Sequence, residues 1–187
     1  MRIISGKLKG KSLSFLKSDT TRPLKDSVKE NIFNIIIHSN LINLSLENSN
    51  ILDLYSGIGS FGLECMSRGA SKITFVEMDN KVTQVLNENL LNLSLKDKTV
   101  VVNDKIENFL KDCNEQKFDI IFFDPPFAEK NYLEELKLLG KKKIYSKNHI
   151  VIIHREKDTI DNFEKIIEPF IIKKYGRSKI IFARFLI

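Results

Sequence analysis

The sequence predicts a doubly wound α/β fold with a Rossmann-like sheet, and three features support this. Beyond residue 46, short apolar runs alternate with stretches of helical periodicity. Nearly continuous apolar strands separated by helices are typical of a parallel sheet that is covered on both faces. The first run leads into a glycine-rich turn, and the C-terminal end has no room for another helix. We therefore expect a parallel sheet whose last strand is antiparallel.

The first 45 residues are expected to form a small N-terminal extension. Apolar and polar residues alternate on either side of Gly6 and Gly10, a pattern that predicts a short β-hairpin. Arg22-Pro23 then breaks the chain, and Asp26 is a candidate N-cap for the helix that follows. The helix would place five apolar side chains on one face: Val28, Ile32, Phe33, Ile35 and Ile36.

The main domain is expected to span residues 46–187. Its predicted strands are 51–56, 72–78, 99–104, 118–124 and 149–156. Its predicted helices lie near 60–68, 80–92, 105–112 and 129–139. Residues 171–187 are expected to form a terminal hairpin of two strands.

Charge is concentrated at the start of the chain. The 187 residues carry a net charge of +6, and residues 1–30 hold eight basic and three acidic side chains. Such concentration indicates a polyanionic partner, of which nucleic acid is the simplest. Lys7, Lys9 and Lys11 are candidate phosphate contacts on the expected hairpin, with Arg22 and Arg177 as further candidates. We expect residues 1–25 to dock RNA rather than to belong to the cofactor fold.

Several classes of protein are disfavoured by composition. No apolar run approaches the ~20 residues that a membrane helix needs, and the basic start is interrupted by Gly and Ser, unlike a secretory signal. We therefore expect a cytoplasmic protein without a membrane partner. Cys65 and Cys113 are expected to be reduced thiols. The cysteines and histidines are scattered, so no metal site is predicted.

The turn after the first strand has the spacing of a nucleotide-binding loop. Gly57, Gly59 and Gly62 form a G-x-G-x-x-G motif, which alone is a weak signal because glycines also relieve crowding in tight turns. Glu77 follows Gly57 by 20 residues at the end of the next strand, where a carboxylate can bind ribose hydroxyls. Together these residues predict a nucleotide cofactor.

Two further carboxylates favour S-adenosylmethionine over a dinucleotide. Asp53 lies within the first strand, where it could hold the cationic amino group of a methionine moiety. Asp104 closes the third strand and could receive the adenine amino group, or it could cap the following helix. A buried carboxylate is costly without a partner, so both residues indicate ligand or loop donors.

The fourth strand ends in the most specific motif of the chain, Asp124-Pro125-Pro126-Phe127. Neither proline can donate a backbone hydrogen bond, so the strand must stop there. The Asp124 carboxylate and the Pro125 carbonyl would then accept the two N–H bonds of an aromatic amine. A fixed carboxylate stabilises the positive charge that develops on the nitrogen during methyl transfer. Phe127 could stack on the base, which must be flipped out or unpaired.

At these motifs the chain resembles the RsmD family, bacterial methyltransferases that modify a guanine 2-amino group of 16S ribosomal RNA. The resemblance rests on RIISGKLKGKSL, TRPLKDSVKENIFNII, LDLYSGIGSFGLECMSRGASKITFVEMD, VVND and FDIIFFDPPF. It implies the class I methyltransferase sheet with a small N-terminal extension. Leu24, Lys29 and Tyr55-Ser56 depart from the family's usual residues.

The resemblance also implies site residues. Asp53, Tyr55, Ser56, Gly57 and Gly59 would surround the methionine part of S-adenosylmethionine. Glu77 would bind the ribose, Met78 would pack on the adenine and Asp104 would face its edge. Asp124, Pro125, Pro126 and Phe127 would be catalytic.

The expected substrate is 16S ribosomal RNA, presented as free RNA, as the small ribosomal subunit or as an assembly particle, and the expected state is a monomer. Because adenine and cytosine also carry exocyclic amines, a DNA methyltransferase stays an alternative. A dinucleotide-dependent oxidoreductase would leave Asp53 and Asp124-Pro-Pro unexplained. A non-catalytic RNA-binding module would leave the cofactor motifs unexplained, and methylation of protein glutamine would favour Asn over Asp124.

Overall fold

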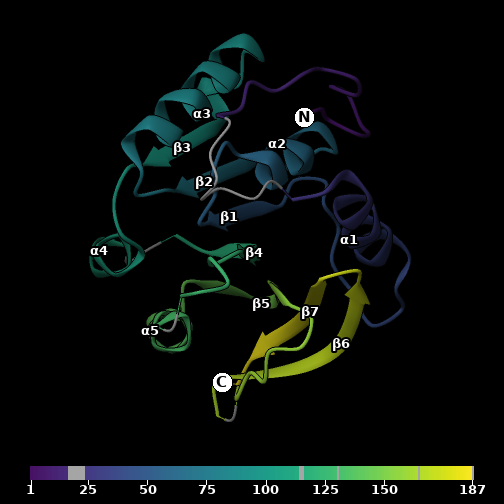
Figure 1. The fold of residues 1–187 in the computed structure, drawn as a ribbon, viewed down its shortest axis with the longest axis vertical. Coiled ribbons are helices and arrows are strands. Elements are labelled where there is room, and N and C mark those ends of the chain that lie inside the picture. The colour runs from purple at the N-terminus through teal and green to yellow at the C-terminus, as the bar shows by residue number, and fades with distance from the viewer. Residues whose placement is uncertain (17–23, 114–115, 130, 164, 187) are drawn as a thin grey trace.

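A seven-stranded mixed sheet forms the centre of the molecule, in the order β3-β2-β1-β4-β5-β7-β6 (Figure 1). The computed structural model describes residues 1–16, 24–113, 116–129, 131–163 and 165–186. Strands β1 (Asn50–Leu54), β2 (Lys72–Val76), β3 (Thr99–Val102), β4 (Phe118–Phe123) and β5 (Tyr145–Glu156) pair in parallel. Strand β7 (Ser178–Phe185) is antiparallel to both β5 and β6 (Ile167–Tyr175). The predicted fold class and terminal hairpin are confirmed.

Helices cover both faces of this sheet, and the strands β1, β2 and β4 are almost wholly buried between them. The helices are α1 (Asp26–His38), α2 (Ser60–Ser67), α3 (Asn80–Asn92), α4 (Ile106–Asp112) and α5 (Tyr132–Lys142), with a 3₁₀ turn at Lys96–Lys98. Side chains of α1, α2 and α3 pack in one core cluster with Ile51 and Ile120, whereas those of α4 and α5 pack with Leu52 and Ile121. Successive strand residues thus serve opposite faces.

The strand order reverses between β1 and β4, which determines where a ligand can bind. β1 pairs with β2 on one side and with β4 on the other, so the connections leave β1 in opposite directions. In open α/β sheets, ligands bind beyond the carboxyl ends of the strands at this point. The residues that follow Leu54 and Phe123 therefore lie at the expected site.

The N-terminal segment forms a short, irregular version of the expected hairpin. Its two arms share one antiparallel bridge, between Arg2 and Ser12, and the Ile3 and Leu13 N–H groups donate across it to the Lys11 (3.0 Å) and Met1 (2.9 Å) carbonyls. Helix α2 also holds the segment: the Glu64 carboxylate accepts hydrogen bonds from the backbone N–H groups of Ile4 (2.8 Å) and Ser5 (3.0 Å).

A buried ion pair joins this segment to α1 and α2. Lys29 is fully buried, and its ammonium lies 3.8 Å from the Glu64 carboxylate while it donates to the Arg2 carbonyl (3.0 Å) and the Ser60 hydroxyl (3.2 Å). Burial lowers the pKa of Lys29, and the Glu64 and Asp26 carboxylates oppose that shift. The N-terminal segment is therefore packed against the sheet domain.

The expected capping role of Asp26 is wrong. Lys25 occupies the N-cap of α1 without a side-chain cap, and Asp26 lies in the first turn, 3.8 Å from the Lys29 ammonium. The expected apolar face is otherwise present, with Val28, Ile32, Phe33 and Ile36 buried. In the part of the chain that the structure describes, no helix has the length and apolarity to cross a bilayer.

We predict that Glu64→Ala lowers the free energy of unfolding by about 3–5 kcal/mol. The change leaves the buried Lys29 ammonium without this carboxylate partner and two backbone N–H groups without an acceptor. Urea denaturation measures this loss. Glu88→Ala, which removes an exposed carboxylate on α3, is the matched control and should change stability by less than about 0.5 kcal/mol. Equal effects of the two changes would contradict a structural role for the Glu64 network.

Candidate active site

The glycine turn after β1 combines open space on one side with tight packing on the other. Gly57 (φ +55°) and Gly59 (φ +84°) adopt left-handed conformations that disfavour other residues. A Cβ on Gly57 would meet no atom within 4 Å. A Cβ on Gly59 would lie 2.5 Å from a Leu86 methyl, and one on Gly62 would lie 2.4 Å from the Phe75 ring. The motif therefore fits both interpretations of its glycines, relief of crowding and access for a ligand. Gly59 and Gly62 allow close packing, and Gly57 leaves its backbone accessible.

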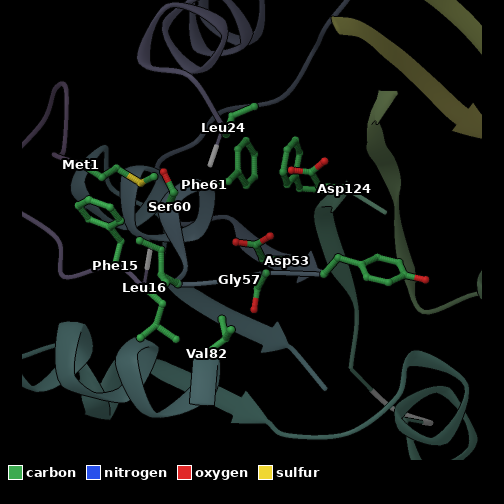
Figure 2. Close-up of a pocket in the computed structure, with 14 residues that line it drawn as sticks. Met1, Phe15, Leu16, Leu24, Asp53, Gly57, Ser60, Phe61, Val82 and Asp124 are labelled. Carbon is green, nitrogen blue, oxygen red and sulfur yellow. The ribbon is translucent and has the colours of Figure 1, made fainter. Parts of the chain in front are cut away.

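Asp53 lies directly beneath this turn. Its carboxylate is buried and accepts a hydrogen bond from the Gly62 N–H (2.9 Å) at the start of α2. Burial raises the pKa of Asp53 well above its ordinary value, and the neighbouring Asp124 and Glu77 carboxylates raise it further. Figure 2 shows Asp53 and Asp124 lining one pocket with Phe61 and Gly57. A bound cation between these acids would favour their ionised forms.

Ser56 provides an independent sign of a ligand in this pocket. Its hydroxyl is buried and has no hydrogen-bond partner, and it is the sole such side-chain atom among the residues that the structure describes. A buried hydroxyl without a partner is costly. Because Ser56 lines the pocket next to Gly57 and Asp53, a polar ligand group there would remove that cost. These residues fit the amino and carboxylate groups of a methionine moiety.

Glu77, the predicted ribose ligand, supports the glycine turn. One carboxylate oxygen accepts from the Gly57 N–H (3.0 Å) and the other from the Asp79 N–H (2.9 Å). Each oxygen keeps a further lone pair for another donor. A second pocket extends from Glu77 along Met78, Asp104 and Ile106.

Two predicted adenine contacts, Met78 and Asp104, line this second pocket. Met78 is 64% exposed, so its surface is available to a ring. Asp104 accepts from the Lys105 N–H (2.7 Å) and the Asn108 amide (2.9 Å). The hydrogen bond from Asn108, followed by that from Lys105, lowers the pKa of Asp104. Lys105 occupies the N-cap of α4 without a side-chain cap, so the capping alternative for Asp104 is wrong. Asp104 is exposed and lines the second pocket.

Tyr55 joins the two pockets and has a partner that the sequence did not reveal. Its backbone is left-handed (φ 56°), and its hydroxyl donates to the Glu135 carboxylate (2.6 Å) on α5. Burial raises the pKa of Glu135 to about 7; the Tyr55 hydrogen bond opposes this shift, and Glu107 and Glu129 add to it. An acid on a helix gives no sign in the sequence of a partner 80 residues away.

The motif after β4 occupies the other side of the first pocket. β4 ends at Phe123, and the Asp124 N–H donates a long hydrogen bond to the Leu54 carbonyl (3.4 Å), so the two strand ends stay together. Pro125 is buried, whereas Pro126 is exposed and Phe127 is half-buried. The Asp124 side chain is 23% exposed and lines the pocket that contains Asp53.

Two consecutive residues of β5 hold this motif, and sequence reasoning missed both. The Nδ1 atom of His154 lies 2.8 Å from Asp124 Oδ1. The guanidinium of Arg155 donates to the Pro126 carbonyl (3.4 Å) and pairs with Asp161 (3.4 Å). His154 was considered only as a metal ligand. The position of His154 near the end of the strand that pairs with β4 is what could have indicated a role beside Asp124.

The candidate RNA contacts are dispersed. Lys7, Lys9 and Lys11 are exposed. The Lys7 N–H donates to the Ser67 carbonyl (2.7 Å) at the C-terminal end of α2, so Lys7 lies about 12 Å, the length of this eight-residue helix, from the glycine turn. Arg177 is exposed at the β6–β7 turn and lies 3.6 Å from Glu156. Arg22 lies outside the described residues.

The N-terminal segment also contributes to the first pocket. Met1, Phe15, Leu16 and Leu24 line it opposite Asp53 (Figure 2). Residues 1–25, expected to serve RNA docking alone, thus include part of the pocket wall. Among the described residues, no cluster of His, Cys, Asp or Glu could hold a metal ion.

Comparison with known proteins agrees with this geometry. The family model described as "Conserved hypothetical protein 95" matches residues 1–184. "Ribosomal RNA small subunit methyltransferase D" of Haemophilus influenzae is 35% identical over 160 residues, 84% of this chain and 80% of that protein. A solved Escherichia coli structure described as a methyltransferase has a TM-score of 0.84 at 26% identity and covers 99% of this chain and 97% of its own. A methyltransferase fold solved with S-adenosylhomocysteine has a TM-score of 0.62 at 15% identity, over 80% of this chain and 48% of its own.

The sheet order, the glycine turn and the two pockets define a class I methyltransferase, a class whose methyl donor is S-adenosylmethionine. The chain belongs to the RsmD family. The resemblance inferred from the sequence motifs is thereby confirmed.

We predict that Glu77→Ala weakens binding of S-adenosylhomocysteine by roughly ten- to hundred-fold or more, because each charge-assisted bond to the ribose is worth about 1.5–3 kcal/mol. Isothermal titration calorimetry measures the dissociation constant. Glu88→Ala is the control for loss of an exposed carboxylate. Since Glu77 also holds the Gly57 N–H, denaturation of the free protein separates a loss of stability from a loss of affinity. An unchanged dissociation constant would contradict the assignment.

We predict that Glu135 makes stability depend on pH. Its pKa is about 7 in the folded protein against 4.5 ordinarily, so the folded state binds more protons in between. The free energy of unfolding should therefore decline as pH rises from about 4.5 to about 7 through this group. The difference in stability between Glu135→Gln and wild type should change across that window in urea titrations. A constant difference would contradict the shifted pKa.

Proposed function

We propose that this protein transfers a methyl group from S-adenosylmethionine to the exocyclic 2-amino group of a guanine in 16S ribosomal RNA of the small subunit. The observation that carries the proposal is the shared pocket: Asp124, the candidate acceptor for the target amine, lines the same pocket as Asp53, Ser56 and Gly57. The amine and the methyl donor would therefore meet at the edge where β1 and β4 end.

The cofactor, when bound, supplies an electrophilic methyl group on a sulfonium. Asp53 and Ser56 would hold its methionine portion, and Glu77 its ribose. Met78 and the pocket beside Asp104 would take the adenine. These contacts fix the direction from which the methyl group is presented.

Asp124 supplies the chemistry on the target side. The lone pair of an aromatic amine is delocalised, so the nitrogen is a weak nucleophile. If the Asp124 carboxylate and the Pro125 carbonyl accept its two N–H bonds, the nitrogen can become pyramidal and direct its lone pair out of the base plane. Positive charge then develops on the nitrogen, where a carboxylate stabilises it. The resulting cation is acidic, so no strong base is needed before attack.

Phe127 sets the plane of the base. Its half-buried ring follows Pro126 and lies at the same edge as Asp124. An aromatic side chain in this position can stack on a base that has left its helix. Attack from above the base plane needs the neighbouring bases to be absent, so the target guanine must be flipped out or unpaired.

Two observations support ribosomal RNA as the substrate. Three relatives that match over most of this chain are named small-subunit ribosomal RNA methyltransferases. In addition, Lys7, Lys9 and Lys11 are exposed on the N-terminal segment, and basic side chains attract RNA phosphates. Phosphate contacts position a nucleic acid without reading its sequence, so a surface one helix length from the pocket can still orient the substrate.

Nucleoside analysis tests the substrate and the base. Deproteinised 16S RNA, small subunits and duplex DNA are each incubated with methyl-labelled S-adenosylmethionine, digested and chromatographed. We expect label in N2-methylguanosine from ribosomal RNA or subunits. Label in a methylated adenine or cytosine of DNA would support the DNA alternative and contradict this proposal.

We predict that Asp124→Ala lowers the turnover number by at least about 10²–10³-fold, because it removes a preorganised charge from the reacting nitrogen. The dissociation constant for S-adenosylhomocysteine should change by less than about three-fold, a shift below 1 kcal/mol. Asp119→Asn alters a carboxylate at the opposite end of β4, where it accepts from the Asn50 N–H, and should retain turnover. Near-normal turnover in Asp124→Ala would remove the catalytic assignment.

We predict that replacing Lys7, Lys9 and Lys11 by Gln flattens the plot of log RNA affinity against log salt. If all three contact phosphates, the slope should fall by about two to three units, less on single-stranded RNA. Filter binding at several salt concentrations gives the slope, and cofactor affinity should not change.

The control is a second triple variant on the other face of the sheet, at the exposed lysines Lys111, Lys137 and Lys141. Its slope should match that of wild type if RNA follows the N-terminal surface. An unchanged slope in the N-terminal variant would instead place recognition at Arg22 or at Arg177.

A further inference from the structure

His154 lies behind the candidate catalytic carboxylate. It is buried near the end of β5, with its Nδ1 atom 2.8 Å from Asp124 Oδ1 and its Nε2 atom 2.9 Å from the Ser178 hydroxyl. β4 and β5 run parallel with Phe123 opposite Ile153, so the following residues of the two strands lie side by side. The sheet register itself therefore brings Asp124 to His154.

The partners of the imidazole determine which nitrogen carries the proton. An ionised carboxylate can only accept hydrogen bonds, so Nδ1 must be the protonated nitrogen. In the neutral ring, Nε2 then accepts from the Ser178 hydroxyl, which can rotate to donate. A ring held at both nitrogens has a defined orientation and can fix that of the group to which it donates.

We propose that His154 is a positioning residue for methyl transfer: its Nδ1–H holds one carboxylate oxygen of Asp124, so that the other oxygen faces the target amine. This rests on the proposed function of Asp124. Among the described residues, His154 is the sole side chain with a hydrogen bond to the Asp124 carboxylate. Without it, the partly exposed carboxylate could rotate, and misplacement by about 1 Å can cost about 10²-fold in rate.

The same ring also contacts the second candidate catalytic side chain. The rings of Phe127 and His154 are 5.6 Å apart at an interplanar angle of 75°, an edge-to-face contact. His154 thus braces both the acceptor of the amine and the aromatic ring expected to stack on the base. Its loss should lower the turnover number more than it changes the affinity for either substrate.

Two isosteric variants separate positioning from packing. In His154→Asn the side-chain amide nitrogen takes the place of Nδ1 and can still donate to Asp124. In His154→Gln the amide nitrogen takes the place of Nε2, so the bond to Asp124 is lost although the side chain is closer in size to histidine. Positioning requires that Asn functions better than Gln, whereas packing alone favours Gln.

A second histidine of the same strand gives a matched control. His149 is also buried; its Nδ1 lies 2.8 Å from the Ser146 carbonyl, and its Nε2 accepts from the Phe185 N–H (3.0 Å). It precedes the continuous pairing of β5 with β4, which runs from Ile150 opposite Ile120 to Ile153 opposite Phe123. His149→Gln should therefore lower stability and leave the turnover number near that of wild type.

The test compares turnover number, KM for RNA and the dissociation constant for S-adenosylhomocysteine in wild type, His154→Asn, His154→Gln and His149→Gln. We expect His154→Asn to keep turnover within about ten-fold of wild type and His154→Gln to lose about 10–10²-fold, with cofactor affinity unchanged in both. Equal turnover in the two His154 variants, or a loss confined to KM, would overturn the proposal.

A spectroscopic measurement decides the matter independently of activity. Imidazole ¹⁵N NMR of the wild-type protein, with the His154 signals assigned through His154→Asn, should show a proton on Nδ1, and Asp124→Ala should abolish that preference. A neutral ring protonated on Nε2 would overturn the proposal. If wild type methylates no ribosomal RNA, the proposed function fails, while the NMR result still shows whether His154 holds Asp124.

Discussion

The parallel pairing of β1 with β4 is the constraint on which the site depends. Asp53 lies opposite Phe122, and Leu54 lies opposite Phe123, so the chain that leaves each strand emerges at the same edge. The segment after β1 enters the glycine turn, and the segment after β4 enters Asp124-Pro-Pro. Two carboxylates consequently line one pocket with a buried Ser56 hydroxyl that lacks a partner. Burial and mutual repulsion raise the pKa of Asp53, so the arrangement suits a ligand that brings positive charge.

Features encoded within a short stretch of sequence could be predicted. The strands and helices of the main domain follow from periodicity, and the glycine turn with Glu77 follows from spacing. The structure adds a contact that spacing does not predict, a hydrogen bond from the Gly57 N–H to Glu77 across 20 residues. The rule that predicts helix N-caps from residue type failed at α1. Asp26 is a good N-cap residue by type, yet Lys25 occupies the N-cap of α1 and Asp26 lies in the first turn, 3.8 Å from the Lys29 ammonium.

Long-range partners could not be predicted. Glu64 binds the backbone of Ile4 and Ser5 across about sixty positions, and Tyr55 finds Glu135 across 80 positions. Each partner is an ordinary acid on a helix, where acids are usually solvated. The role of the N-terminal segment was missed for the same reason. Once Glu64 and Lys29 fix it against α2, the residues that follow can line the cofactor pocket, so a basic surface and a pocket wall belong to one segment.

The two prolines show why a motif alone does not make a site. They end β4 because they cannot donate to the sheet. The same property removes two backbone donors from the turn, where the Pro126 carbonyl accepts from the Glu129 N–H (2.9 Å). Side chains from both faces of the neighbouring strand β5 restrain the turn. His154 holds the Asp124 carboxylate, and Arg155, whose guanidinium also lies 4.0 Å over the Tyr132 ring, donates to the Pro126 carbonyl. Arg155 is in turn fixed by Asp161, which pairs with Lys179 of β7 at 2.7 Å. One layer of buried ion pairs thus connects the antiparallel C-terminal hairpin to the candidate catalytic turn. A substitution in β7 that displaces Lys179 would therefore affect Pro126 although Lys179 does not contact the substrate.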